Sequence, residues 1–484
     1  MRLVALVAML VVAGCGARTA LDAPEPSDGG APVPETCDGL DEDGDGRVDE
    51  GIPPRVCGDA RCPREVAACV DGSLRECPPV VVEPETCNRR DDDCDGRVDE
   101  GLGFGPIGDP IVIRDIRDER TLDDCTSCYE VLDVQLATFG RELHAVWHLF
   151  FVGVIDVPNT YARRLSDRGE PLEPSRPLFD AVTTRVALAP SHSGQTIASY
   201  CERHDDSIDY PGSRFLDARG RPVGGAVERG DADVRCLRPP SVLWTGERHL
   251  FLRNLTGEQL SIESADRDGS SRGLAEVSWP WFGAAPAVAF DGEVALLAFN
   301  EGRDLRVVEI AADGTPTSYS VPAALGRPDE GRYDVGRMPI HSDGDGFLLG
   351  ADRFVTTHPF DRTADRALDL FRYDRRERAL TRLGSTPIAT NGPIQLSRRG
   401  PGELLVVGSD VGRGLPGGGS LEVLLLSDTG ERLERWVFEP DDGIGEGIRA
   451  VDVHAHGSSI YVAYVRVLDH SETRIELLEL GCSG

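Results

Sequence analysis

The stretch Ile460–Val465 reads IYVAYV, and it is the last of seven short apolar runs that decide the fold. The six earlier runs are Leu143–His148 (LHAVWH), Thr196–Cys201 (TIASYC), His249–Arg253 (HLFLR), Val294–Phe299 (VALLAF), Phe347–Ala351 (FLLGA) and Glu403–Gly408 (ELLVVG). Successive runs start 53, 53, 45, 53, 56 and 57 residues apart. Short apolar runs bounded by turn residues predict strands, and units of about 50 residues with four short strands are typical of propeller blades.

Residues typical of turns recur with the same spacing as these runs. They are Asp167–Gly169, Asp217–Gly220, Asp268–Gly269, Asp313–Gly314 and Asp428–Gly430, while Asp374–Arg376 occupies the same place in the fifth unit without a glycine. Seven units over residues 107–481 therefore predict a mainly β fold with a seven-bladed propeller in domain 102–484. An array of β-sandwiches or a β-helix is the alternative, and the unit length favours the propeller.

The last unit ends near its third strand, Arg474–Leu480. A ring that stopped there would leave an open sheet edge, which invites aggregation. The apolar run Pro110–Arg114 (PIVIR) precedes the first full unit and has no partner in it. We therefore expect this run to complete the last blade and close the ring.

The N-terminus indicates export. Residues 1–14 begin with Met1-Arg2 and continue as an apolar run too short to span a bilayer, so we interpret them as a signal peptide. The run ends VAGC at Cys15, which resembles a bacterial lipobox; the resemblance implies that Cys15 is lipidated and anchors the chain to a membrane. In lipoproteins, an aspartate after the lipidated cysteine often signals retention in the inner membrane, so Gly16 at this position implies the outer membrane or cell surface. Residues 15–34 are rich in Pro, Ala and Gly and form a flexible tether.

Residues 35–101 contain an acidic duplication. Residues 35–51 read ETCDGLDEDGDGRVDEG and residues 85–101 read ETCNRRDDDCDGRVDEG, a spacing of 50 residues. In a D-x-D-x-D-G loop, the aspartates supply oxygens to Ca²⁺ and the glycine permits a sharp turn. The predicted metal ligands are Asp41, Asp43, Asp45, the carbonyl of Arg47 and Asp49, then Asp91, Asp93, Asp95, the carbonyl of Arg97 and Asp99. Ile52 and Leu102 stand where an EF-hand has its bidentate glutamate, so these are not full EF-hands.

Both segments resemble the metal-binding motif of the MopE family, which is frequent in myxobacterial surface proteins. The family name implies copper, but soft Cu(I) prefers sulfur ligands and these loops offer carboxylates, so we expect Ca²⁺. The second copy has both family cysteines, Cys87 and Cys94, whereas Gly44 replaces the second cysteine in the first copy. Cys37 is thus left without a local partner.

The other cysteines are disulfide candidates, as expected in an oxidising compartment. Cys57, Cys62, Cys69 and Cys77 lie between the two motifs and permit three pairings among themselves. In the propeller, Cys125 and Cys128 suggest a structural disulfide, Cys201 and Cys236 could bridge neighbouring blades, and Cys482 could reach Cys125 or Cys128. The module 35–101 is therefore predicted to be held by disulfides and ions rather than by a large core.

The formal net charge of −32 argues against nucleic acid as a partner. The sequence shows no nucleophile elbow, zincin or phosphate-loop motif. His454 and His456 alternate on one strand, and a solvated strand face is favoured there over metal ligation. We expect a surface lipoprotein without enzymatic activity, whose propeller binds a protein or glycan; the alternative is an exported propeller hydrolase acting on glycans.

Overall fold

The computed structural model describes the chain in segments. The described residues are 34–42, 46–57, 64–77, 84–85, 92, 102–115, 130–150, 159–180, 182–190, 195–203, 209–228, 241–246, 248–254, 259–265, 271–278, 287–301, 304–317, 323–324, 332–333, 340–342, 346–354, 366–390, 392, 394–400, 403–409, 419–439, 447–456, 459–469 and 472–482. The chain divides into two compact units, Met1–Val81 and Val82–Gly484. In these segments, no helix is long and apolar enough to cross a membrane.

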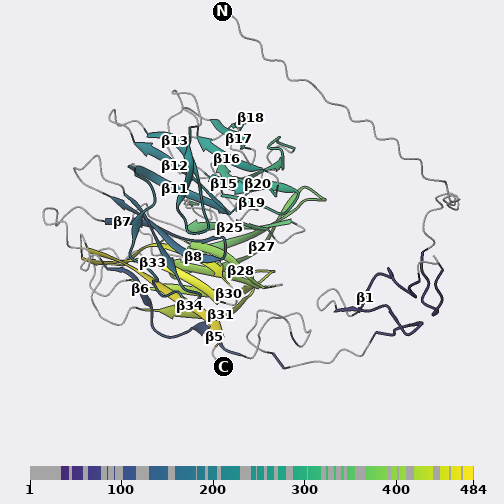
Figure 1. The fold of residues 1–484 in the computed structure, drawn as a ribbon. Coiled ribbons are helices and arrows are strands. Elements are labelled where there is room, and N and C mark those ends of the chain that lie inside the picture. The colour runs from purple at the N-terminus through teal and green to yellow at the C-terminus, as the bar shows by residue number, and fades with distance from the viewer. Residues whose placement is uncertain are drawn as a thin grey trace, which may run out of the picture. The chain divides into compact units, whose positions relative to one another are not determined.

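Seven antiparallel sheets form the seven blades of a propeller (Figure 1). In each of the first four blades, the strands pair in the order in which they follow along the chain. Blade 1 consists of β7 (Glu130–Phe139), β8 (Glu142–Phe150), β9 (Thr160–Leu165) and β10 (Arg176–Pro177), and blade 2 of β11 (Thr183–Pro190), β12 (Thr196–Arg203), β13 (Asp209–Leu216) and β14 (Pro222–Glu228). Blade 3 consists of β15 (Ser241–Trp244), β16 (His249–Asn254), β17 (Gln259–Ala265) and β18 (Ser271–Ser278), and blade 4 of β19 (Ala287–Phe290), β20 (Val294–Glu301), β21 (Asp304–Ala311) and β22 (Ala323–Ala324).

In blade 5, β23 (Arg332–Tyr333) and β24 (Ile340–Ser342) both pair with β25 (Gly346–Phe354), which is followed by β26 (Arg366–Asp374) and β27 (Ala379–Pro387). Blade 6 consists of β28 (Ile394–Gly400), β29 (Glu403–Ser409), β30 (Leu421–Ser427) and β31 (Arg432–Phe438). Blade 7 consists of β32 (Gly447–His456), β33 (Ser459–Asp469) and β34 (Glu472–Cys482), and β34 also pairs with β5 (Phe104–Pro106) and β6 (Ile111–Asp115). The seven predicted apolar runs all fall in the second strand of a blade, and the predicted seven-bladed propeller is confirmed.

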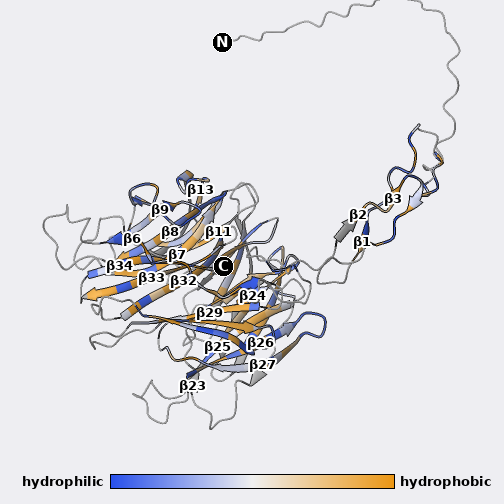
Figure 2. Cartoon of the chain, turned by 90° about the horizontal axis from the view of Figure 1, so that it is seen from below, coloured by the Kyte–Doolittle hydropathy of each residue, from blue (hydrophilic) through white to orange (hydrophobic). Residues whose placement is uncertain are grey.

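Each second strand is buried on both faces, which explains its unbroken apolar sequence. In β33, Tyr461, Ala463 and Val465 pack toward blade 1. The alternate residues Ile460, Val462 and Tyr464 pack toward blade 6. Because side chains of a strand alternate between its two faces, one strand can serve two blade interfaces. Figure 2 shows long hydrophobic (orange) segments on β29 and β33.

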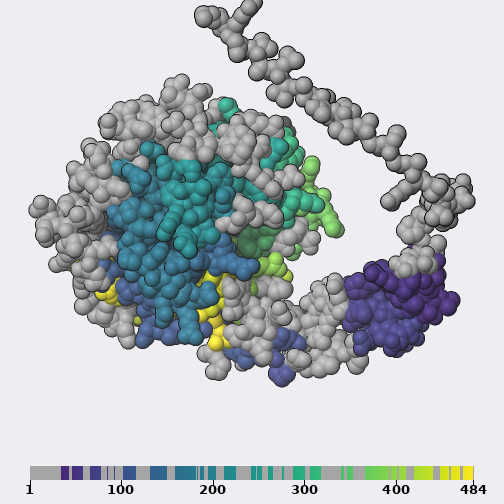
Figure 3. Space-filling model, viewed as in Figure 1, coloured from purple at the N-terminus to yellow at the C-terminus, as the bar shows by residue number. Residues whose placement is uncertain are grey.

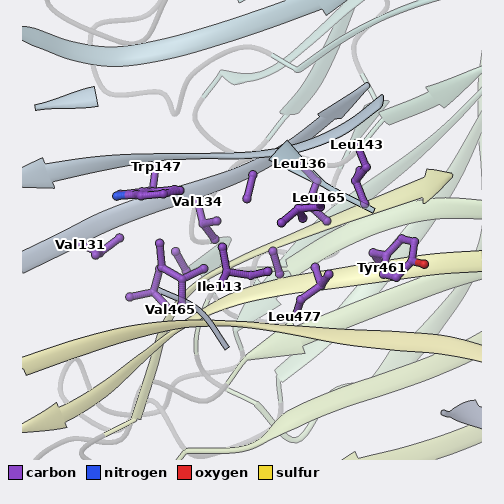
Figure 4. Packing of buried hydrophobic residues seen from close by; sticks show 14 of the residues in the cluster. Ile113, Val131, Val134, Leu136, Leu143, Trp147, Leu165, Tyr461, Val465 and Leu477 are labelled. Atoms are coloured by element: carbon purple, nitrogen blue, oxygen red, sulfur yellow. The ribbon is translucent and has the colours of Figure 1, made fainter. Parts of the chain in front are cut away.

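Apolar cores fill the interfaces between neighbouring blades. One core lies between each adjacent pair, running from the seam of blades 7 and 1 to that of blades 6 and 7. The core at the seam of blades 7 and 1 includes Ile113, Trp147, Tyr461 and Leu477 (Figure 4). Burying such side chains is worth about 1.5–3 kcal/mol each, so the stability of the ring resides between its blades.

The ring is closed by strands from its two sequence ends. The strand β6 pairs antiparallel with β34, with Ile475 opposite Arg114 and Leu477 opposite Ile111. β5 pairs further along the same strand, with Leu480 opposite Pro106. Figure 3 shows the blue residues of the first blades directly beside yellow C-terminal residues. The predicted pairing of residues 110–114 with the last blade is confirmed.

The turn between the third and fourth strands of several blades contacts the preceding blade. Gly169 has φ +78, and an added Cβ would lie 2.4 Å from Leu477 Cδ2 of blade 7. Gly220 has φ +69, and its Cβ would lie 2.6 Å from Phe139 of blade 1. These turns therefore need glycine both for backbone conformation and for space. In blade 5, where the glycine is missing, Arg375 instead pairs with Asp291 of blade 4, with 2.6 Å between Nη1 and Oδ2.

Side chains also connect the first strands of neighbouring blades. Gln135 Nε2 donates to the carbonyl of Val186 over 2.7 Å, which joins blades 1 and 2. Gln395 Nε2 donates to the carbonyl of Val451 over 3.1 Å, which joins blades 6 and 7. Backbone groups on the unpaired edge of a strand need partners, and these amides satisfy them across the interface.

Candidate metal centre in the Asp-rich module

Glu35 joins the two ends of the loop in the first acidic motif. Its Oε1 accepts from the backbone nitrogen of Glu42 over 3.1 Å, and its Oε2 accepts from that of Asp49 over 3.0 Å. Thr36 donates from its nitrogen to Glu42 Oε2 over 2.9 Å and from Oγ1 to Oε1 over 2.8 Å. These hydrogen bonds from Thr36 lower the pKa of Glu42. The Glu-Thr pair of the motif therefore holds both ends of the loop at residues 42–49 together.

The loop itself turns around Asp41. The backbone nitrogen of Gly46 donates to Asp41 Oδ2 over 2.9 Å, and Gly46 has φ +91. An added Cβ at Gly46 would meet nothing within 4 Å, so backbone conformation alone calls for glycine there. This is the curvature that directs successive oxygens of a D-x-D-x-D-G segment toward one point. Asp43 and Asp45, the next two predicted ligands, lie outside the described residues.

Asp49 fastens the loop to the start of the motif. Its Oδ1 accepts from the backbone nitrogens of Asp38 and Gly39, each over 3.0 Å. Asp49 also adopts a positive φ of 57°, which is uncommon for a residue with a side chain. One of its two carboxylate oxygens is thus committed to backbone donors, so its ligand capacity for a cation rests on Oδ2.

Two disulfides support this loop. Cys37 pairs with Cys69, and Cys57 pairs with Cys77. The expectation that Cys57, Cys62, Cys69 and Cys77 pair among themselves is therefore wrong for Cys69, and Cys37 does have a partner. The reason is spatial: β3 (Cys69–Val70) and β4 (Ser73–Leu74) form a hairpin whose Gly72 closely approaches Gly39. The short strands β1 (Arg55–Cys57) and β2 (Arg64–Val66) form a second hairpin nearby in sequence.

Potential ligand atoms of Cys37, Asp49 and Cys69 lie within 4.8 Å of one another. The two sulfurs are joined in a disulfide, so neither is a thiolate. Thiolates rather than disulfide sulfurs bind soft metals. In the oxidised chain, Asp49 is therefore the one anionic donor of this group.

The second motif repeats part of the first. Glu85 Oε1 accepts from the backbone nitrogen of Asp92 over 2.7 Å, and these residues correspond to Glu35 and Glu42 after a shift of 50. The predicted ligands Asp91, Asp93, Asp95, Arg97 and Asp99 lie outside the described residues, as do the cysteines 87 and 94. Of the first set, Asp41, Arg47 and Asp49 are described; Asp41 and Arg47 are exposed, and Asp49 is half-buried. The predicted boundary between residues 101 and 102 is also untested, because residues 93–101 are outside these segments.

Two further cysteines, Cys201 and Cys482, are disulfide-bonded. The candidates Cys62, Cys125, Cys128 and Cys236 are outside the described residues, and their pairing stays a prediction. Disulfides of this number are typical of proteins that fold outside the cytoplasm.

Both acidic segments match the MopE metal-binding motif. The family model, described as "Putative metal-binding motif" and named for copper binding, covers residues 32–50 and 82–100. It thus includes Glu35, Thr36 and Cys37, which close the first loop, as well as the aspartates. No metal is identified by this match, and no curated protein matches the sequence.

Solved structures resemble this chain at low identity. A "putative 6-phosphogluconolactonase" from Bacteroides fragilis is 13% identical with a TM-score of 0.43, covering 68% of this chain and 91% of that one. One from Bacteroides uniformis is 14% identical with a TM-score of 0.43, covering 69% and 96%. The polysaccharide lyase Uly1 is 10% identical with a TM-score of 0.47, covering 78% and 100%. At such identities no activity can be transferred to this chain.

The sequence interpretation missed the residues that shape the loop. Glu35 and Thr36 were not singled out, although the duplication repeats them as Glu85 and Thr86. The repetition of a glutamate and a threonine before each D-x-D-x-D-G core could have indicated that these side chains shape the loop. The pairing of Cys37 with Cys69 had no such signal, because it depends on how the hairpin folds back.

Proposed function

We propose that the chain is an exported, lipid-anchored bacterial protein that acts by binding and not by catalysis. Its two Asp-rich loops bind Ca²⁺ and stiffen the N-terminal module. Its propeller presents a surface to a protein or glycan ligand at the outer membrane or cell surface. The observation that carries the metal assignment is the 2.9 Å hydrogen bond from the nitrogen of Gly46 to Asp41 Oδ2, together with the hydrogen bonds by which Glu35 joins residues 42 and 49.

The donor chemistry supports Ca²⁺ over copper. Carboxylate and carbonyl oxygens suit hard cations, and a flexible loop tolerates the long, irregular coordination of Ca²⁺. The sulfurs of Cys37 and Cys69 are withheld from a soft ion by their disulfide. Mg²⁺ should compete poorly because it demands tight octahedral geometry and gives up water reluctantly.

The two loops should differ in strength. The first loop is supported by a disulfide from outside the motif, between Cys37 and Cys69. In the second, we expect Cys87, which precedes the loop in sequence, to pair with Cys94, which lies within it, and to clamp it directly. Both lack the bidentate glutamate of an EF-hand, so we expect weak affinity, on the order of 10⁻⁴–10⁻³ M, with the second loop the tighter.

Calorimetry on the oxidised full-length protein tests this proposal. Calcium should bind at two sites, Asp91→Ala or Asp95→Ala should remove the tighter one, and Asp41→Ala the weaker one. Glu76→Ala is the matched control, because this exposed carboxylate lies in the same module outside both loops, and it should leave the isotherm unchanged. Tight copper binding without a calcium signal would replace calcium by copper as the ligand of the motif.

A further inference from the structure

The seam between the last and first blades contains a carboxylate and two imidazoles on one face of a strand. Asp452, His454 and His456 alternate along β32, so they share one face, and that face lies against β7 of blade 1. Asp452 Oδ2 accepts from the backbone nitrogen of Leu136 over 2.7 Å. The predicted solvated face is therefore wrong: these side chains are half-buried against the neighbouring blade.

Two imidazole nitrogens converge on one hydroxyl across this seam. His454 Nε2 lies 2.8 Å from Thr138 Oγ1, and His456 Nδ1 lies 3.3 Å from the same oxygen. Both rings therefore direct a nitrogen at the same small volume from one strand. Because Thr138 is on blade 1 and the histidines are on blade 7, this volume lies at the interface between the first and last blades.

A carboxylate orients one of the rings. Asp167 Oδ1 lies 3.4 Å from His456 Nε2, at the turn of blade 1 that contacts blade 7. A carboxylate accepts hydrogen bonds, so it favours the tautomer of His456 with the proton on Nε2 and leaves the Nδ1 lone pair toward Thr138. Histidine ligands of metals commonly donate their other N–H to such a carboxylate.

The second ring is also suited to bind a cation. His454 Nε2 already points at the Thr138 hydroxyl from the half-buried face of β32. A neutral imidazole can place its proton on Nδ1 and present Nε2 as a lone-pair donor. For both nitrogens to bind a cation, the Thr138 side chain must also turn its Oγ1 away from the volume between them.

We propose that His454 Nε2 and His456 Nδ1 form a binding site for a divalent transition-metal cation such as Zn²⁺, with Asp167 as the outer partner of His456. Imidazole donors suit Zn²⁺, Cu²⁺ and Ni²⁺, whereas the carboxylate loops of the N-terminal module suit Ca²⁺. The ligands come from the closing blade and the orienting carboxylate comes from the first blade. A cation bound there stabilises the closed ring, because it binds the folded seam and not the separated blades.

Zinc titration of the full-length protein in excess Ca²⁺ tests the site independently of the Asp-rich loops. We expect one Zn²⁺ site by calorimetry and a higher unfolding temperature in its presence. The double variant His454→Gln, His456→Gln keeps hydrogen-bonding side chains at the seam and should lose the site. Asp167→Asn should weaken zinc binding at least about tenfold. His341→Ala, on β24 of blade 5, is the control and should bind zinc as the unchanged protein does.

Thr138→Val separates the site from a purely structural role of the same residues. This variant removes the hydroxyl between the two rings but keeps both imidazoles. Retained zinc binding, with zinc restoring the unfolding temperature that the variant loses, supports the site. Zinc binding that is unchanged in the double histidine variant, absent from the unchanged protein, or abolished by Asp41→Ala instead would overturn it.

Discussion

A methyl group at Gly169 has no room between the first and last blades. Its Cβ would lie 2.4 Å from Leu477 Cδ2 and 3.2 Å from Tyr461 Cε1, and the backbone φ of +78 is itself unfavourable for alanine. Overpacking and left-handed strain each cost on the order of 1–3 kcal/mol. We expect Gly169→Ala to lower the free energy of unfolding by about 2–4 kcal/mol, as measured by urea denaturation.

Gly246 provides the control for this substitution. It has a similar φ of +88, but an added Cβ would meet nothing within 4 Å. Gly246→Ala should therefore show the backbone strain alone, about 1–2 kcal/mol. Equal losses for the two variants would mean that the turn of blade 1 does not press against blade 7.

His144 makes the stability of the propeller depend on pH. It is fully buried, and burial, with smaller effects of Arg176 and Arg164, lowers its pKa from 6.5 to about 4. The unfolded chain takes up a proton on this ring below pH 6.5, whereas the folded chain does so only near pH 4. The free energy of unfolding should thus fall as pH falls through this window, by at most about 3 kcal/mol from this ring.

Urea denaturation at several pH values between 7.5 and 5 measures this slope before most carboxylates titrate. His144→Phe should make it shallower, because the aromatic contact to Phe139 at 4.4 Å between ring centroids can be kept while the titrating group is removed. His454, whose pKa is also lowered to about 4, should account for part of the slope that remains. An unchanged slope in the His144 variant would assign the effect to other groups.

Single cysteines show what a sequence pattern cannot decide. The identity of Cys37 and its missing local partner were visible, but its bond to Cys69 depends on Gly72 approaching Gly39. Nothing in the spacing of the cysteines encodes that approach. The hydrogen bond between Gly46 and Asp41, by contrast, is local and could be predicted from the six-residue D-x-D-x-D-G segment.

Among elements, the second strands of the blades could be predicted and their neighbours largely could not. A strand such as β29 is buried along its whole length, so only apolar residues are tolerated at most of its positions. The outermost β31 (RLERWVF) is mostly exposed, and its only consecutive apolar residues are at its last three positions. Outer strands as short as β10 and β22, two residues each, carry too few side chains for any pattern.

The closing strand could be predicted by elimination, and its loss should be severe. A chain that begins at Val131 lacks β5 and β6, which leaves the edge of β34 unpaired and removes Ile113 from the seam core. We expect this chain to aggregate, because an exposed sheet edge beside an apolar core pairs with other chains. A chain that begins at Gly103 keeps both strands and should remain monomeric in size-exclusion chromatography.

Equal behaviour of these two chains would show that β6 contributes little. The milder substitution Ile113→Ala keeps the strand and creates a cavity in the fully buried seam, so it should cost about 2–5 kcal/mol. It separates loss of packing from loss of the strand.

At the scale of the whole molecule, the proposed lipid anchor is the feature that would most constrain where the protein works. Metabolic labelling with a palmitate analogue should tag the protein, because Cys15 ends a lipobox-like run. Cys15→Ser should abolish the tag and release the protein from the membrane fraction. Labelling that survives this substitution would contradict the anchor.

The identity of the ligand that we propose for the propeller could not be predicted from the sequence, for a physical reason. The repeated residues that reveal the blades are buried between them, where they stabilise the ring and touch no ligand. Binding residues of such a fold lie on the connecting loops, whose lengths and sequences vary from blade to blade. The sequence pattern that indicates the fold therefore gives no information about what the propeller binds.

The pairing of residues 111–115 with residues 472–482 also sets the order of events during synthesis. Arg474 of the last strand and its partner Asp115 are 359 residues apart, so the first strand of the ring leaves the ribosome long before its neighbour exists. An incomplete chain keeps two unsatisfied edges, one at each end of the growing array, which quality-control proteases and chaperones can recognise. Both edges are covered only after residues 472–482 have been synthesised, so the ring cannot close before that point.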